Sequence, residues 1–228
     1  MIEAVVFDLD GVLVDSEHVW DDVREGLAHE RGGRWTERAQ TDMMGMSSTE
    51  WSIYMHDVIG LPESPEAINA EVVRRMEARY AEHLPLVEGA EEAVERLAGS
   101  FRLALASSSN RPLIDAVLAG SRLAGHFEVT VSSEEVERGK PAPDVFLEAA
   151  RSLRVAPLAC AAIEDSGNGI RAASAAGMRV IAIPNRRYPP PPDALALADT
   201  VLDSLAELTP ARVREPHLFS GPPSSSPR

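Results

Sequence analysis

Short apolar runs that end in polar or turn-forming residues recur along the chain. The first run occupies residues 2–9, and four more lie at Arg102–Ala106, Phe127–Val131, Leu158–Ile163 and Arg179–Ile183. Segments with helical periodicity separate most of these runs, at Glu88–Leu97, Pro112–Leu118, Pro143–Leu153 and Gly169–Ala176. Strands that alternate with helices are typical of a parallel sheet that is covered by helices on both faces. The pattern therefore predicts an α/β fold built on such a sheet.

One long stretch after the first predicted strand breaks this alternation. It carries helix-like patterns and no strand pattern, near Glu17–Arg31, Thr49–Ile59 and Pro65–His83. We therefore predict a separate helical domain at residues 16–85. It is inserted into a core that is formed by residues 1–15 and 86–210.

The C-terminal segment differs in composition from the rest of the chain. From Glu215 onward it becomes a low-complexity sequence rich in Ser and Pro. Such a segment lacks the apolar side chains that would offset the entropy lost on folding. We predict that residues 211–228 are disordered.

The overall composition is that of a globular protein, with 44% hydrophobic and 25% charged residues. No apolar run approaches the roughly 20 residues that span a bilayer. The N-terminus leads straight into an apolar segment without a basic region or a cleavage site, so we expect no secretion signal. Cys160 is the only cysteine and cannot form an intramolecular disulfide, which fits a cytoplasmic protein.

The charge balance bears on possible partners. The formal net charge is -14, from 36 acidic and 22 basic residues. This excess of negative charge argues against a nucleic-acid or anionic-membrane partner. An anionic substrate would need a local positive group, and Lys140, the only lysine in a chain whose other basic residues are all arginine, is a candidate. The sequence leaves the oligomeric state open.

The first candidate site follows the first strand. In open α/β sheets, ligands bind beyond the carboxyl ends of the strands, so polar residues at these ends are of most interest. Asp8 and Asp10 leave the first strand on the same side, and Gly11 permits a sharp turn of the backbone. The two carboxylates could bind a hard cation such as Mg²⁺. Alternatively, one could act as a nucleophile and the other as a general acid and base.

Three further clusters follow later strands. Hydroxyl and amide groups at Ser107, Ser108, Ser109 and Asn110 could hold phosphate oxygens, although such clusters are often helix caps. Lys140 lies in the proline-rich turn Gly139-Lys140-Pro141-Ala142-Pro143. Glu164 and Asp165 could complete a cation site, with Ser166 capping the next helix. A cation beside Lys140 would create a positive field in an acidic protein, as a phosphate substrate requires.

These four clusters, in this order and spacing, resemble the four motifs of the haloacid dehalogenase-like superfamily. The resemblance covers residues 1 to about 208. It implies a Rossmann-like core and a small α-helical cap inserted after the first strand. Within the superfamily, the chain is most similar to the β-phosphoglucomutase-like branch, which includes many sugar-phosphate phosphatases. The resemblance therefore implies an Mg²⁺-dependent phosphatase that acts on a small phosphorylated metabolite, such as a sugar phosphate.

The resemblance also implies a role for each motif residue. Asp8 would attack phosphorus and form an aspartyl-phosphate. Asp10 would protonate the leaving alcohol and later deprotonate water. Ser107 and Lys140 would bind the transferring phosphoryl oxygens. Mg²⁺ would be held by Asp8, by the backbone carbonyl of Asp10 and by Asp165, with Glu164 nearby or acting through water. Phosphate or substrate contacts are expected from Gly11, Ser108, Ser109, Asn110 and Trp20.

Two positions depart from the phosphomutases of this branch. The mutase has a cap histidine where this chain has Trp20. It also has a cap arginine, which would grip the second phosphate of a bisphosphate intermediate, where this chain has Ser48. Both differences favour a phosphatase, and the phosphomutase remains the alternative. A non-catalytic module that binds a phosphometabolite is a remote alternative. Trp20 is either part of the cap core or a platform for the substrate.

Overall fold

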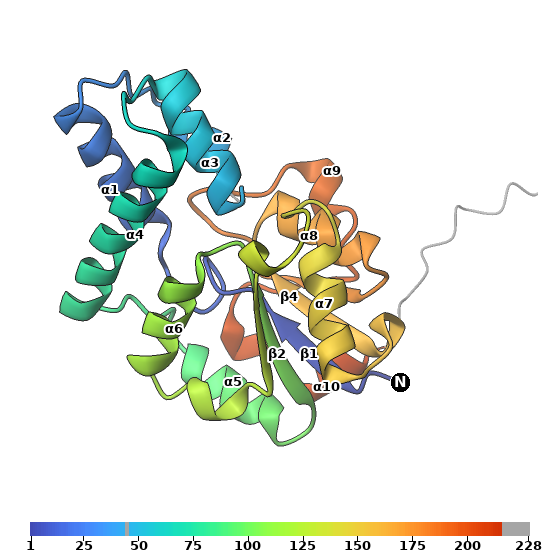
Figure 1. Cartoon of the computed structure of the whole chain (residues 1–228). Coiled ribbons are helices and arrows are strands. Elements are labelled where there is room, and N and C mark those ends of the chain that lie inside the picture. Colours follow the sequence, from blue (N-terminus) through green and yellow to red (C-terminus); the bar gives the residue numbers. More distant parts are fainter. Residues whose placement is uncertain (44–45, 216–228) are drawn as a thin grey trace, which may run out of the picture.

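The computed structural model describes residues 1–43 and 46–215. Its centre is a six-stranded sheet in the order β3-β2-β1-β4-β5-β6, and every neighbouring pair of strands is parallel (Figure 1). The strands are β1 (Ala4–Phe7), β2 (Arg102–Ser107), β3 (Val129–Ser132), β4 (Cys160–Glu164), β5 (Arg179–Ala182) and β6 (Thr200–Val201). The prediction of a Rossmann-like parallel α/β sheet is confirmed.

Helices cover both faces of this sheet, as expected from strands that are apolar on both sides. Val5 and Phe7 of β1 pack with α5 (Ala90–Ala98) and α6 (Arg111–Ala119) on one face. Ala4 and Val6 pack with α7 (Asp144–Leu153) and α8 (Gly167–Ala175) on the other face. These residues of β1 are completely buried. The sheet is therefore fixed in register by apolar contacts on both sides, which also fixes the positions of its strand ends.

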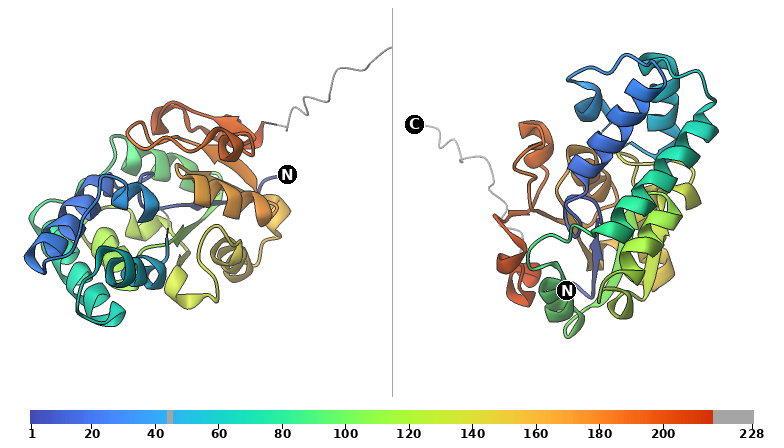
Figure 2. Two further views of the ribbon diagram at one scale, coloured as in Figure 1. Left: turned by 90° about the horizontal axis from the view of Figure 1, so that it is seen from above. Right: turned by 90° about the vertical axis from the view of Figure 1, so that its left-hand side faces the viewer.

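A group of four helices lies beyond the carboxyl end of β1, apart from the sheet (Figure 1). They are α1 (Glu17–Glu30), α2 (Ala39–Met43), α3 (Ser48–Tyr54), which continues into a π-helical turn at Met55–Ile59, and α4 (Pro65–Glu82). Ser47 and Ser64 cap α3 and α4, because each side chain accepts a hydrogen bond from a backbone N–H of the first turn. We call α1–α4 the cap helices. Their apolar residues form one cluster with the α5–α6 face of the sheet. Figure 2 shows the cap helices from two further sides.

Several short elements complete the fold. The remaining helices are α9 (Pro192–Leu195) and α10 (Pro210–Arg214), and short 3-10 turns occur at Ala124–His126, Ser133–Glu135, Pro157–Ala159 and Leu205–Glu207. The sequence pattern did not predict α2 or β6, which are only five and two residues long. Within residues 1–43 and 46–215, none of the helices combines the length and the hydropathy that a membrane span requires.

The prediction that disorder begins at residue 211 is wrong for its first residues. Residues 211–214 belong to α10, which is capped by the Thr209 side chain and begins with proline at its first position. Val213 is completely buried in the apolar cluster of the α5–α6 face. One capped turn with one buried valine is thus enough to hold this segment. The rest of the predicted tail, residues 216–228, lies outside the described residues.

Candidate active site

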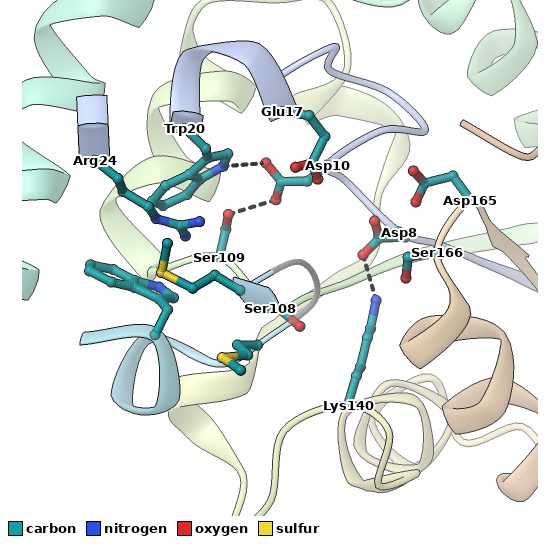
Figure 3. Close-up of a pocket in the computed structure, with 13 residues that line it drawn as sticks. Asp8, Asp10, Glu17, Trp20, Arg24, Ser108, Ser109, Lys140, Asp165 and Ser166 are labelled. Atoms are coloured by element: carbon teal, nitrogen blue, oxygen red, sulfur yellow. Dashed lines mark hydrogen bonds and ion pairs between the residues drawn. The ribbon is translucent and has the colours of Figure 1, made fainter. Parts of the chain in front are cut away.

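The carboxyl ends of β1, β2 and β4 bring most of the candidate residues to one place (Figure 3). Phe7 pairs with Leu105 of β2 and with Ile163 of β4, so the residues that follow these three strands are direct neighbours. Asp8 leaves β1 at this edge, and Glu164 is the last residue of β4. Lys140 enters the same place from the loop before α7. The topology of the sheet therefore assembles side chains that are up to 156 positions apart in the sequence.

Lys140 forms a buried ion-pair cluster with two carboxylates. Its Nζ lies 2.5 Å from Asp8 Oδ1 and 2.6 Å from Glu164 Oε1. The exposed fractions of Lys140, Asp8 and Glu164 are only 2%, 6% and 0%. A buried charge is costly unless it is paired. Lys140 therefore belongs to the interior of this site and is not a surface lysine.

The Glu164 carboxylate is held from all sides. Its Oε2 accepts hydrogen bonds from the backbone N–H groups of Asp165 and Ser166 and from the Ser166 hydroxyl, each at 3.1 Å. Ser166 also caps α8, because its hydroxyl accepts a hydrogen bond from the N–H of Gly169. Glu164 therefore positions Lys140. Because both Glu164 carboxylate oxygens already accept hydrogen bonds, Asp8 and Asp165 are the better-placed direct ligands for a cation.

Gly169 gives this carboxylate its space, and a substitution there provides a test. A Cβ at Gly169 would overlap the Glu164 carboxylate. We expect Gly169→Ala to displace Glu164 from Lys140, to lower stability by about 1–3 kcal/mol as overpacking does, and to reduce activity at least ~10-fold. Thermal melting and phosphate-release rates measure both effects. Gly26→Ala in α1 is the control, since nothing lies within 4 Å of its added Cβ. A fully stable and active Gly169→Ala protein would contradict this account of Glu164.

Asp165 is the residue whose surroundings best fit a metal ion. Both of its carboxylate oxygens are buried and have no hydrogen-bond partner among the described residues. Asp8, Glu164 and Asp165 each offer an oxygen, and these three atoms lie within 4.8 Å of one another. Gly11, at a φ of +83°, lies so close that a Cβ there would overlap the Asp165 carboxylate. Oxygen ligands of this kind suit Mg²⁺, so the residues present fit that cation.

The electrostatics of the cluster also favour a bound cation. Burial raises the pKa of Asp8 well above its ordinary value, with Lys140 opposing and Glu164 adding to the rise. Burial and the neighbouring Glu164 and Asp8 likewise raise the pKa of Asp165. Although burial lowers the pKa of Lys140, the two carboxylates outweigh it and raise that pKa overall. Three buried carboxylates thus share one ammonium, and a divalent cation would supply the missing positive charge.

Asp10 points away from this cluster, toward the cap helices. Its Oδ1 accepts hydrogen bonds from the Ser16 hydroxyl at 2.5 Å and from the Trp20 indole N–H at 3.1 Å. Its Oδ2 accepts from the Ser109 hydroxyl at 2.6 Å and, more weakly, from the Ser107 hydroxyl at 3.3 Å. The two carboxylates predicted as a pair therefore have separate surroundings, Asp8 beside Lys140 and Asp10 beside α1 (Figure 3).

The predicted hydroxyl cluster divides into two groups. Ser108 and Ser109 line the pocket between the sheet and the cap helices. Ser107 is completely buried behind them, where its hydroxyl accepts a hydrogen bond from the Ser109 N–H. The Asn110 amide donates to Asn69 of α4 and to Glu134, and Asn110 is not among the residues that line this pocket. In this structure Ser107 shapes the loop, and Asn110 connects that loop to a cap helix.

The cap side of the pocket contains residues that the sequence reasoning missed. Trp20 was named, and it lies on the pocket wall, 5% exposed and packed at 5.9 Å from the Trp51 ring. Arg24, Glu17 and Trp51 also line the pocket, together with Met43 and Met46. The sequence signal that could have identified Arg24 is its spacing from Trp20. Residues that are four positions apart lie on one face of a helix, so Arg24 shares the buried face of Trp20. Trp20 is therefore both part of the cap core and a wall of the pocket.

The pocket is small in this structure. Its volume is about 50 Å³. A water molecule needs roughly 10–15 Å³ of such space, so the pocket holds only a few waters. A phosphorylated sugar is larger than this. On the cap side, the flexible Met43 and Met46 side chains form part of the wall.

The fold and this site define an α/β enzyme with a buried carboxylate and lysine centre under a helical cover. A family model for haloacid dehalogenase-like hydrolases matches residues 2–177. The chain is 35% identical to hexitol phosphatase B of Escherichia coli (strain K12), over 91% of this chain and 95% of that protein. It is also 32% identical to a bifunctional riboflavin kinase/FMN phosphatase of Arabidopsis thaliana. This match covers 90% of this chain but only 54% of that longer protein.

A solved structure is also similar. CbbY from Rhodobacter sphaeroides in complex with phosphate matches with a TM-score of 0.79 and 30% identity, over 91% of this chain and 96% of that chain. The chain therefore belongs to the haloacid dehalogenase-like hydrolase family. The predicted membership of its sugar-phosphatase branch and the predicted enzyme class, a phosphatase, are confirmed by these matches.

Proposed function

We propose that this protein is an Mg²⁺-dependent phosphatase that hydrolyses a small phosphorylated metabolite of the sugar-phosphate class through an aspartyl-phosphate on Asp8. The observation that carries the proposal is the buried contact of Lys140 with Asp8, 2.5 Å apart, beside the unpartnered oxygens of Asp165. A carboxylate can approach a phosphate dianion only where positive groups neutralise both. The similarity to hexitol phosphatase B supports the sugar-phosphate class.

The first chemical step belongs to Asp8 and Asp10. An oxygen of Asp8 attacks phosphorus while the bond from phosphorus to the ester oxygen breaks. The leaving oxygen takes a proton from the Asp10 carboxyl group. Lys140 stays charged throughout, because its contacts with Asp8 and Glu164 favour the ammonium form, and it neutralises the phosphoryl oxygens.

The second step releases phosphate. A water molecule attacks the phosphorus of the aspartyl-phosphate, and the Asp10 carboxylate takes its proton. The bond between phosphorus and the Asp8 oxygen breaks, which restores both aspartates and yields inorganic phosphate. The hydroxyls of Ser109 and Ser16, which donate to Asp10 in this structure, hold its carboxylate ready near the leaving-group side of the pocket.

Asp8, Asp165 and the backbone carbonyl of Asp10 would hold the Mg²⁺ ion, with Glu164 behind them. When bound, the ion supplies positive charge that balances the carboxylates and the phosphate. Gly11 leaves space beside Asp165 for this arrangement. Ser108 and Ser109 face the pocket and are the proposed phosphate or substrate contacts of their loop. We also propose a cytoplasmic location, which is supported by the free and buried Cys160.

Phosphate release tests this function directly. We expect purified protein to liberate inorganic phosphate from members of a panel of sugar and polyol monophosphates in Mg²⁺, to lose this activity in EDTA, and to regain it with added Mg²⁺. Calcium is expected to restore it poorly, because its larger and looser coordination shell misplaces the phosphoryl group. Metal-independent release would contradict the proposed cofactor. Conversion of β-glucose 1-phosphate to glucose 6-phosphate, stimulated by a glucose bisphosphate, would instead support the phosphomutase alternative.

A further inference from the structure

One charged group in the pocket has no role in the chemistry described above. Arg24 lies in the middle of α1 and is only 5% exposed. Its guanidinium carbon lies 4.4 Å from the centre of the Trp20 ring and 4.8 Å from that of Trp51. Figure 3 shows the guanidinium beside the Trp20 ring, directed into the pocket that it lines. It is a buried cation at the cap side of the site.

Part of this guanidinium has no partner among the described residues. Its Nε is buried without a hydrogen-bond partner, and none of the described residues forms an ion pair with Arg24. Burial lowers the pKa of Arg24 to about 10, although the carboxylates of Glu17, Asp10 and Asp21 oppose the shift. The group therefore remains charged at neutral pH. A guanidinium presents up to five N–H donors in a planar fork, and the unpartnered Nε shows that the protein does not use all of them.

The position of Arg24 relative to the chemistry indicates which part of a substrate it meets. Lys140 and Asp8 lie on the core side of the pocket, Asp10 lies between, and Arg24 lies on the cap side (Figure 3). Asp10 is the residue proposed to protonate the leaving oxygen. The part of the substrate beyond that oxygen must then extend toward α1, where Arg24 lies against both indoles.

We propose that Arg24 binds a second oxyanion, a phosphate or a carboxylate, at the end of the substrate remote from the hydrolysed ester. This inference rests on the proposed phosphatase function and narrows its substrate class to phosphate esters with a second negative group. An oxyanion accepts two parallel N–H bonds from a guanidinium, which is the strongest form of such a contact. The indoles of Trp20 and Trp51 hold the guanidinium plane in place for it through cation–π contacts.

Two pairs of substrates isolate the second anion. Fructose 1-phosphate and fructose 1,6-bisphosphate share one ester and differ in a second phosphate. Sorbitol 6-phosphate and 6-phosphogluconate differ in a carboxylate. We expect kcat/KM for the doubly anionic member of at least one pair to exceed that of its partner by at least ~10-fold, mainly through KM, and the pair that shows it identifies the oxyanion.

Substitution of Arg24 then tests the assignment. Arg24→Gln is expected to reduce the preference for the second anion at least ~10-fold, and Arg24→Lys to restore part of it by returning the charge. The control is Arg74→Gln, which removes an exposed arginine of a cap helix that is paired with Glu71. If the preference survives in Arg24→Gln, or if the wild-type protein shows none, Arg24 is only a structural part of the cap and the proposal is wrong.

A binding measurement separates this proposal from the proposed phosphatase function. In the Asp8→Asn protein, with Mg²⁺, quenching of tryptophan fluorescence, to which Trp20 and Trp51 in the pocket wall contribute, reports binding without turnover. We expect fructose 1,6-bisphosphate or 6-phosphogluconate to bind at least ~10-fold more tightly than its partner, and Arg24→Gln in this background to remove the difference. Equal affinities overturn the Arg24 proposal. Preferential binding together with no phosphate release from any substrate by the wild-type protein overturns only the phosphatase proposal.

Discussion

Asp8→Asn is expected to reduce phosphate release to background while the protein stays folded. The substitution keeps the size and polarity of the side chain but removes the charge and the attacking oxygen. Loss of a covalent nucleophile costs on the order of 10⁶-fold in kcat in a well-studied serine protease. The fold should survive because Glu164 still neutralises Lys140 at 2.6 Å. Release rates measured with and without Mg²⁺, together with thermal melting, give both outcomes.

Asp15→Asn is the matched control for this substitution. Asp15 lies near the same strand end, but its side chain is 67% exposed and makes a long contact with His18. Its replacement should leave turnover within about 2-fold of wild type, since surface substitutions of this kind have small effects. Substantial phosphatase activity in a folded Asp8→Asn protein would rule out the aspartyl-phosphate mechanism on Asp8.

Most of the fold could be predicted because the apolar pattern of each strand and helix lies within a short segment of the sequence. Strands buried on both faces must be continuously apolar, and the helices between them must bury one side, so β1 to β5 and α5 to α8 leave a strong pattern. The two-residue strand β6 and the five-residue helix α2 are too short for any periodicity. Helix α10 was missed because the disorder of the tail was predicted from its overall composition. The cap at Thr209 and the buried Val213, which hold this helix, are single residues that composition does not reveal.

The core half of the site was predictable for a related reason. Parallel strands end at one edge, so acidic residues and hydroxyls placed at strand ends converge whatever their distance in sequence. Asp8, Glu164 and Asp165 do meet in this way, and Lys140 joins them from the loop before α7. The direction in which each side chain points could not be predicted. Nothing in the sequence distinguishes the buried Ser107 from Ser109, which faces the pocket.

The cap half could not be predicted, because its pocket depends on how helices from different parts of the chain pack together. Arg24 and Trp51 come from α1 and α3 and meet only through tertiary packing. In the sequence, Arg24 is one of 21 arginines, and only its spacing from Trp20 marks it. Arg24 is thus recognised by its burial and by its unpartnered Nε, which only the folded chain displays.

Lys140→Arg is expected to reduce kcat/KM at least ~10²-fold, the scale of losing one donor to the transition state. The Lys140 ammonium fits between Asp8 Oδ1 and Glu164 Oε1 at 2.5 and 2.6 Å, with the Phe146 ring 4.9 Å away. A planar guanidinium needs more space and cannot meet both oxygens in the same way. Because the substitution keeps the positive charge, a loss of activity in a folded protein would result from the different shape of the cation. Arg138→Lys, at an exposed position in the same loop, is the control.

The only lysine of the chain also permits a chemical test of the same contact. An amine-directed acetylating reagent can modify Lys140 and the N-terminal amine, and mass spectrometry of peptides distinguishes them. Because Lys140 is 2% exposed and its pKa is raised by Asp8 and Glu164 against the effect of burial, the native protein should be acetylated at the N-terminus first, with activity retained. In denaturant, Lys140 should react freely, and the refolded product should be inactive because acetylation removes the charge. Rapid native modification of Lys140 with activity retained would place this side chain outside the site.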